Sequence, residues 1–247
     1  MTSVKKVLSV DLDYIMSPCI SLYNNLTSYE PDLASLPDPE YWEILDQDFE
    51  LNKFLTFSQK KLDQIKELWF HQLDKLPVQN IYIAKEHDSI LTFLCQDFLK
   101  KSEVYEIYNI DHHHDIFYTD VDRELIERFN YTGCASWVWY LFYNQRLTQY
   151  FWIRNENSKK TFKTSEFSEA DLIQIPNFQQ YLQYSIEDLF DISFDYIFLC
   201  KSGRFFPWKF EDLWKELVSE SSQRKNYQFM IDEVPYGGLK GVSRNPI

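Results

Sequence analysis

The sequence predicts an α/β protein in which helices cover both faces of a largely parallel sheet. Short β-rich segments alternate with amphipathic helical segments along the chain, which is typical of parallel sheets. The 247 residues contain no internal repeat and fit one domain that spans 1–247. The chain is 45% hydrophobic and 26% charged, as expected for a folded globular domain. We therefore predict a three-layer α/β/α fold.

The first predicted strand covers residues 4–13 and ends in two carboxylates. Prolines at 18, 31, 37 and 39 break any long element in the stretch that follows. Ser58 then has the position of an N-cap for a helix that runs to about Leu76. Apolar side chains recur at helical spacing within it, at Leu62, Ile65, Leu68, Trp69 and Leu73.

The remaining segments continue the alternation. Further strands are predicted at 80–84, 104–110, 149–153 and 195–200. Further helices are predicted at 90–101, 125–129, 135–143 and 207–218, the last with a proline near its first turn. The polar segment 155–169 is expected to be an exposed loop.

Charge and glycine content exclude several classes of protein. The net charge is −13, from 25 basic and 38 acidic residues, which disfavours nucleic acid as a partner. No apolar run reaches the ~18 residues of a membrane span, and the first nine residues do not resemble a signal peptide. Only five glycines occur, none before Gly133, which excludes the glycine-rich loops that hold phosphates.

The cysteines and aromatic residues indicate a reduced, well-packed interior. Four cysteines, with no C-x-x-C spacing, are interpreted as reduced core residues of a cytoplasmic protein: Cys19, Cys95, Cys134 and Cys200. Aromatic residues make up 18% of the chain. Most must pack in the core, although such a surplus also suits a groove for an extended peptide.

Metal-ligand side chains follow three of the predicted strands, where ligands bind in open α/β sheets. They are Asp11, Asp13, His87, Asp111, His113 and Asp115. Strand residues two apart point to the same side, so each cluster is expected to converge. A lone D-x-D is more often a turn or cap signal, and a run of histidines also suits a solvated loop. Four buried carboxylates would, however, repel one another unless cations neutralised them. Oxygen-rich ligands favour manganese over a thiolate-bound zinc.

These motifs resemble the three metal motifs of arginases and other ureohydrolases. The matching stretches are Ser9-x-Asp11-x-Asp13 with Pro18, Glu86-His87-Asp88 and Asp111-x-His113-x-Asp115. Arginases place the D-x-D motif last, whereas here it comes first. That order is similar to a divergent arginase-like group that includes the peptide arginases, as are Asp11-Leu12-Asp13-Tyr14, Asn130-Tyr131 and the stretch from Asp195 to Leu199.

The resemblance implies an arginase-like fold and two Mn²⁺ ions. Asp11 and Asp111 would bridge the ions; His87 and Asp115 would complete one site, and His113 and Asp13 the other. It also implies hydrolysis of arginine side chains in a ribosomally made precursor peptide, a modification that leaves ornithine and releases urea.

Two departures from the arginase pattern bear on substrate and mechanism. Phe117 stands where arginases carry an asparagine that contacts the amino-acid head of free arginine, which favours a substrate already held in peptide bonds. No histidine follows His114, so the proton shuttle of arginases has no counterpart. His112 and His114 are candidates for the general acid, or for residues that orient the metal ligands.

The carboxylate that would hold the guanidinium is not unique in sequence. Glu86 is one candidate, and the others are Asp88, Asp120, Asp122 and Glu233. Trp137, Trp139 and the stretch 205–208 are expected to pack in the core, with a peptide groove as the alternative.

Other functions remain open at this stage. One is a small-molecule ureohydrolase of the arginase or agmatinase type, and another is a deacetylase-like metal-dependent C–N hydrolase. A third is a non-catalytic protein with structural metals, although structural sites are usually closed.

Overall fold

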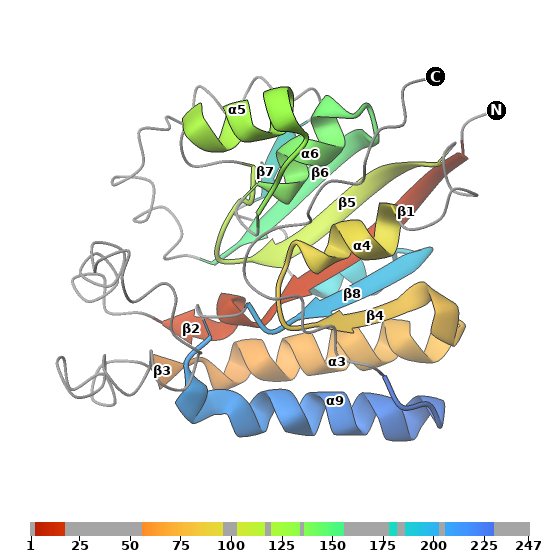
Figure 1. Cartoon of the computed structure of the whole chain (residues 1–247). Helices are drawn as coiled ribbons and strands as arrows, with labels where there is room; N and C mark the ends of the chain where they lie inside the picture. Colours follow the sequence, from red (N-terminus) through yellow and green to blue (C-terminus); the bar gives the residue numbers. More distant parts are fainter. Residues whose placement is uncertain are drawn as a thin grey trace, which may run out of the picture.

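The structure is a computed structural model that describes residues 3–17, 56–95, 103–116, 120–133, 136–155, 178–181, 186–202 and 206–229. Its centre is a six-stranded sheet, and every hydrogen-bonded pair of strands in it is parallel (Figure 1). In spatial order the strands are β4 (Ile81–Ala84), β8 (Tyr196–Cys200), β1 (Ser3–Asp11), β5 (Glu103–Asp111), β6 (Leu147–Arg154) and β7 (Phe178–Tyr181).

The register of the central strands aligns their carboxyl ends at one edge. Asp11, the last residue of β1, pairs with Cys200, the last residue of β8. On the other side of β1, Val10 pairs with Ile110, so Asp111 ends β5 at almost the same level. Parallel pairing therefore brings the acidic strand ends together.

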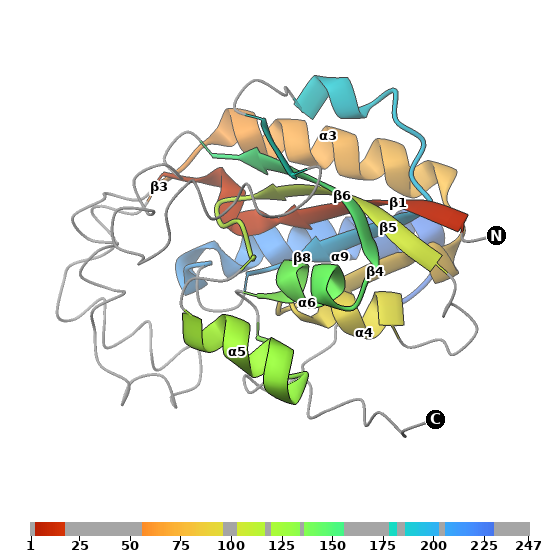
Figure 2. The same cartoon turned by 90° about the horizontal axis from the view of Figure 1, so that it is seen from above.

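Helices cover both faces of the sheet (Figure 2). On one face, α3 (Gln59–Lys75) and α9 (Glu211–Lys225) bury Leu68 and Leu217 in the same core as Leu8 of β1. On the other face, α4 (Ser89–Cys95) and α6 (Trp137–Tyr143) pack in a second core with Val7. Helix α5 (Asp120–Phe129) contacts α6. The predicted three-layer α/β fold is confirmed.

Short elements complete the described part of the chain. Strands β2 (Met16–Ser17) and β3 (Thr56–Phe57) form an antiparallel pair. The 3-10 helices are η1 (Leu12–Ile15), η4 (Val78–Asn80), η7 (Ile186–Leu189) and η9 (Trp208–Phe210). No helix among the described residues is long and apolar enough to cross a membrane.

Helix α3 forms as its sequence predicts. The Ser58 hydroxyl accepts a hydrogen bond from the backbone N–H of Lys61 at 3.4 Å, which satisfies a donor of the first turn. The predicted apolar stripe is buried against the sheet and α9. On this buried face, the indole N–H of Trp69 donates to the Ser221 hydroxyl of α9 at 2.8 Å.

Several boundaries differ from the prediction. The first strand ends at Asp11 rather than at residue 13, because Asp11 caps the 3-10 helix η1. Helix α4 ends at Cys95 in the described residues, and residues 96–102 and the proline-rich stretch 18–55 lie outside them. Asn155 is fully buried, not exposed as expected, because its amide donates to the carbonyls of Tyr14 and Met16.

Candidate metal centre

The six predicted ligands converge beyond the carboxyl ends of the central strands. They form two groups that share Asp111: one adds His87 and Asp115, and the other adds Asp13 and His113. Asp11 belongs to a third group, with His87 and Cys200. Within each group the possible ligand atoms lie within 4.8 Å of one another, close enough for a single cation.

His87 is the centre of the first group. Its Nδ1 lies close to one carboxylate oxygen from each of three aspartates: 3.1 Å from Asp11 Oδ2, 3.2 Å from Asp111 Oδ2 and 2.8 Å from Asp115 Oδ2. None of these contacts has the geometry of a hydrogen bond within the described part of the chain. Neighbouring ligands of an octahedral cation with bonds of about 2.1 Å lie about 3 Å apart. The contacts of His87 Nδ1 with Asp111 Oδ2 and Asp115 Oδ2 have this spacing, and these three residues form a group that could hold one cation.

His113 is the centre of the second group. Its Nδ1 lies 2.8 Å from Asp13 Oδ2 and 3.9 Å from Asp111 Oδ1. In the described residues Asp13 Oδ2 is buried without a hydrogen-bond donor. An imidazole nitrogen and two carboxylate oxygens suit a hard or borderline cation such as Mn²⁺.

Asp111 faces both groups with different oxygens. Its Oδ2 lies toward His87, and its Oδ1 toward His113. Asp111 is fully buried, and its carboxylate lies between the two imidazoles. Asp111 therefore belongs to both groups that could hold a cation.

Local backbone geometry, rather than strand alternation, brings the ligands together. Asp13 lies in η1, where its backbone N–H donates to Asp11 Oδ1 at 3.1 Å. His113 follows the end of β5, and its N–H donates to Asp111 Oδ1 at 2.8 Å. Asp115 adopts a positive φ of 50°. The expectation that strand periodicity aligns these residues is therefore wrong, although the residues do converge.

A set of buried polar side chains orients the ligands. The Ser9 hydroxyl lies 2.7 Å from His87 Nε2, on the opposite side of the ring from the carboxylates. The indole of Trp137 donates to Asp115 Oδ2 at 2.7 Å. Asn109 donates to Asp111 Oδ2 at 3.0 Å. Partners of this kind fix the tautomer and the direction of metal ligands.

The buried carboxylates of the centre raise one another's pKa. Burial raises the pKa of Asp11 well above its ordinary range, and the neighbouring Asp13 and Asp111 carboxylates raise it further. Burial, and then the Asp115 charge, raise the pKa of Asp111 as well. Two bound cations would neutralise this repulsion.

The two histidines respond mainly to the same carboxylates. Burial lowers the pKa of His87, but the carboxylates of Asp115, Asp11 and Asp111 outweigh it and hold the pKa well above its ordinary value. Burial also lowers the pKa of His113, but the carboxylates of Asp13, Asp111 and Asp115 outweigh this effect and raise the pKa to about 9. A cation that binds here must displace these protons.

The two candidates for the general acid lie beside the carboxylate groups. His114 Nδ1 accepts the backbone N–H of Ile116 at 3.0 Å, and burial lowers the pKa of its ring to about 3. Burial also lowers the pKa of His112 to about 4, while its backbone N–H donates to Asp13 Oδ1.

The other predicted residues are only partly described. Glu86 is half-buried beside His87, and Asp88 is buried next to it. Phe117 and Glu233 lie outside the described residues, as do the side chains of Asp120 and Asp122. Trp137 and Trp139 belong to the core, as expected.

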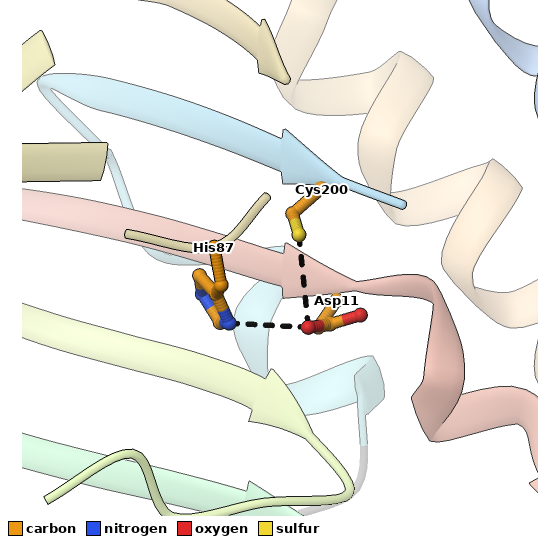
Figure 3. Close-up of side chains that lie close together, drawn as sticks. All are labelled: Asp11, His87 and Cys200. Atoms are coloured by element: carbon orange, nitrogen blue, oxygen red, sulfur yellow. Dashed lines mark hydrogen bonds and ion pairs between the residues drawn. The ribbon is translucent and has the colours of Figure 1, made fainter. Parts of the chain in front are cut away.

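Cys200 lies beside the predicted ligands, although the sequence analysis did not include it among them. Figure 3 shows its sulfur and the His87 ring both directed at the Asp11 carboxylate. Cys200 Sγ lies 3.7 Å from Asp11 Oδ2. It is reduced and fully buried, as expected for a core cysteine. Its position as the last residue of a predicted central strand was the available signal.

Comparison with known proteins identifies no relative: no family model, no curated protein and no solved structure matches this chain.

Proposed function

We propose that this chain is a metal-dependent hydrolase that converts arginine side chains in a peptide to ornithine with release of urea, using two Mn²⁺ ions. The observation that carries the proposal is the position of Asp111 between two separate histidine-containing groups. A shared carboxylate of this kind supports a pair of cations about 3.5–4 Å apart.

Each ligand residue has a defined part in this proposal. His87 and Asp115 would hold one ion, His113 and Asp13 the other, and Asp111 both. Asp11 was expected to bridge the ions as well, but it groups with His87 and Cys200, and so it is assigned to the ion on the His87 side. Such cations act as Lewis acids that make water nucleophilic near neutral pH. Ser9 and Trp137 keep His87 and Asp115 pointed at the centre through hydrogen bonds of 2.7 Å each. Both are buried, so the ligands are pre-organised.

The acidic surroundings suit a cationic substrate. Glu86 and Asp88 flank His87 in the turn that precedes α4, and a planar guanidinium is best held by a carboxylate. The net charge of −13 also favours the approach of a cation. These features agree with arginine as the group that is hydrolysed.

The preference for a peptide rests on Phe117. A phenyl ring cannot hydrogen-bond the ammonium or carboxylate of free arginine, and leaving such charges unpaired costs several kcal/mol. A peptide carries neither charge at that position. We therefore expect kcat/KM to be higher for a peptide arginine than for free arginine, by ~10²-fold or more.

The test is a competition in which protein loaded with Mn²⁺ receives free arginine, agmatine and an arginine-containing peptide at equal concentrations. Conversion of arginine to ornithine lowers the peptide mass by about 42 Da and releases urea. Asp111→Asn is the inactive control, since it alters the shared ligand. Faster turnover of free arginine or agmatine would indicate a small-molecule ureohydrolase instead. No urea from any of these substrates would contradict the proposal.

A further inference from the structure

We propose that Cys200 is a metal ligand that gives the His87 side of the centre a second, thiolate-containing position for Zn²⁺. The position consists of Asp11 Oδ2, His87 Nδ1 and Cys200 Sγ, which lie within 4.8 Å of one another (Figure 3). This inference rests on the proposed function, because it concerns the same metal centre. Its test, however, measures which atoms bind the metal and does not depend on urea release.

The distances suit one tetrahedral zinc ion. With Zn–S bonds of about 2.3 Å and Zn–O bonds of about 2.1 Å, sulfur and oxygen ligands lie about 3.6 Å apart. The thiol of Cys200 donates a hydrogen bond to Asp11 Oδ2, and the two atoms lie 3.7 Å apart, a separation that zinc could span in place of the proton. Asp11 Oδ2 lies 3.1 Å from His87 Nδ1, which completes a sulfur, nitrogen and oxygen set.

A backbone N–H is aimed at the Cys200 sulfur and partly offsets burial and the Asp11 carboxylate, which together raise the pKa of the metal-free thiol well above its usual range. Ser202 adopts a left-handed conformation with φ 76°, which is uncommon for a residue with a side chain. In this conformation its N–H donates to Cys200 Sγ at 3.0 Å. A donor aimed at the sulfur stabilises a thiolate, the form that binds metals. When zinc binds, the thiol proton leaves to buffer as the Zn–S bond forms.

The rest of the set is ready for a cation. His87 is 97% buried, and Ser9 holds its Nε2 so that Nδ1 faces Asp11. An Asp11 carboxylate and a Cys200 thiolate would together neutralise the two charges of the ion. Three protein ligands leave one tetrahedral position open, as in catalytic zinc sites.

The thiolate position and the oxygen-rich position exclude each other, because both need His87 Nδ1. Sulfur selects zinc, whereas the oxygens of Asp111 and Asp115 suit manganese. Zinc at Cys200 would therefore displace the manganese ion on the His87 side. The ion on the His113 side uses neither Cys200 nor His87, so zinc at Cys200 should not displace it.

The experiment is zinc K-edge absorption spectroscopy on the full chain with one equivalent of Zn²⁺. We expect one sulfur neighbour at about 2.3 Å in addition to nitrogen and oxygen neighbours. The sulfur neighbour should disappear in Cys200→Ser and persist in Cys95→Ser, where a half-buried cysteine at the end of α4 is changed instead. Titration of the Mn²⁺-loaded protein with Zn²⁺ should release one equivalent of manganese.

A chain in which Cys19, Cys95 and Cys134 are all replaced by serine keeps Cys200 as its only thiol. A measurement on this chain remains valid even if Cys200→Ser fails to fold. The inference requires that zinc keeps its sulfur neighbour in this chain. Zinc with only nitrogen and oxygen neighbours in the wild-type chain, or in this chain, would overturn the inference. So would a sulfur neighbour that survives Cys200→Ser. A zinc–sulfur bond without any hydrolysis of arginine would leave this inference standing and contradict only the proposed function.

Discussion

At the scale of single residues, the centre depends on how each ligand is held. Asp111 is fully buried, and its two oxygens face two imidazoles. Its orientation is fixed by Asn109, which donates to Oδ2, and by the backbone N–H of His113, which donates to Oδ1. A carboxylate held from both sides cannot turn away from either group. It is therefore the residue whose loss should affect both cations.

Asp111→Asn should reduce the occupancy of both manganese ions, because a neutral amide replaces the shared carboxylate. The matched control is Asp88→Asn, which changes a buried aspartate beside His87 that belongs to none of the three ligand groups. Elemental analysis after dialysis measures the outcome, with close to two equivalents expected for the wild-type chain and the control. Equal metal loss in both variants would mean that Asp111 has no special position.

Ser9→Ala should weaken manganese binding by roughly 10–100-fold, since the hydroxyl that orients His87 is removed. The Ser9 hydroxyl lies 2.7 Å from Nε2 in a fully buried position. Ser89→Ala is the control, because it removes a buried hydroxyl near the centre that makes no hydrogen bond within the described residues. Isothermal titration with Mn²⁺ gives the dissociation constants of the two variants. An unchanged constant for Ser9→Ala would show that the contact is not needed.

At the scale of elements, the alternation of strands and helices was sufficient to predict the fold. The strands predicted at 80–84 and 195–200 agree closely with β4 and β8, because short apolar runs with turn residues on both sides are distinctive. The sequence also indicated that the six candidate residues would lie near one another, since each of them lies at or soon after the end of a strand.

The local geometry that joins these positions could not be predicted from the sequence. Asp13 reaches the centre from a 3-10 helix, and Asp115 from a left-handed backbone conformation. Neither feature has a period that a sequence pattern shows. The burial of Asn155 depends on carbonyls about 140 positions earlier in the chain, at Tyr14 and Met16, and so only tertiary structure reveals it.

Ser221→Ala tests the contact between α3 and α9. It leaves the buried indole N–H of Trp69 without its acceptor, which should lower the free energy of unfolding by about 1–3 kcal/mol. Ser219→Ala makes the same change on an exposed site of α9 and should have little effect. Urea denaturation of both variants measures the difference. Equal stability of the two variants would show that this hydrogen bond does not join the helices.

At the scale of the whole molecule, the fold places a cluster of like charges between two apolar cores. Asp11, Asp13, Asp111 and Asp115 are each at most 4% exposed. The four carboxylates repel one another at the edge of the sheet. They can stay this close together only if cations or protons neutralise their charge. Stability, metal binding and pH are therefore linked in this chain.

The stabilisation that Mn²⁺ gives should increase with pH. His113 has a pKa of about 9 in the folded protein, against 6.5 for an ordinary histidine, so the metal-free fold binds more protons than the unfolded chain. Its contribution to stability is fully present below about pH 6.5 and is lost as the pH rises through about 9. In the proposed function, manganese would replace these protons and bind more tightly as they leave.

Thermal unfolding with manganese and with a chelator, followed across this pH range, measures the effect. The difference in Tm between the two samples should widen from about pH 6.5 to about pH 9. A difference that stays constant or narrows would mean that proton release is not coupled to metal binding.

The most direct test of the account is a crystal structure of the manganese-loaded chain with anomalous diffraction data collected at the manganese edge. The account predicts two anomalous peaks about 3.5–4 Å apart, on either side of the Asp111 carboxylate, one beside His87 and one beside His113. A single peak, or no peak among the six ligand residues, would contradict it.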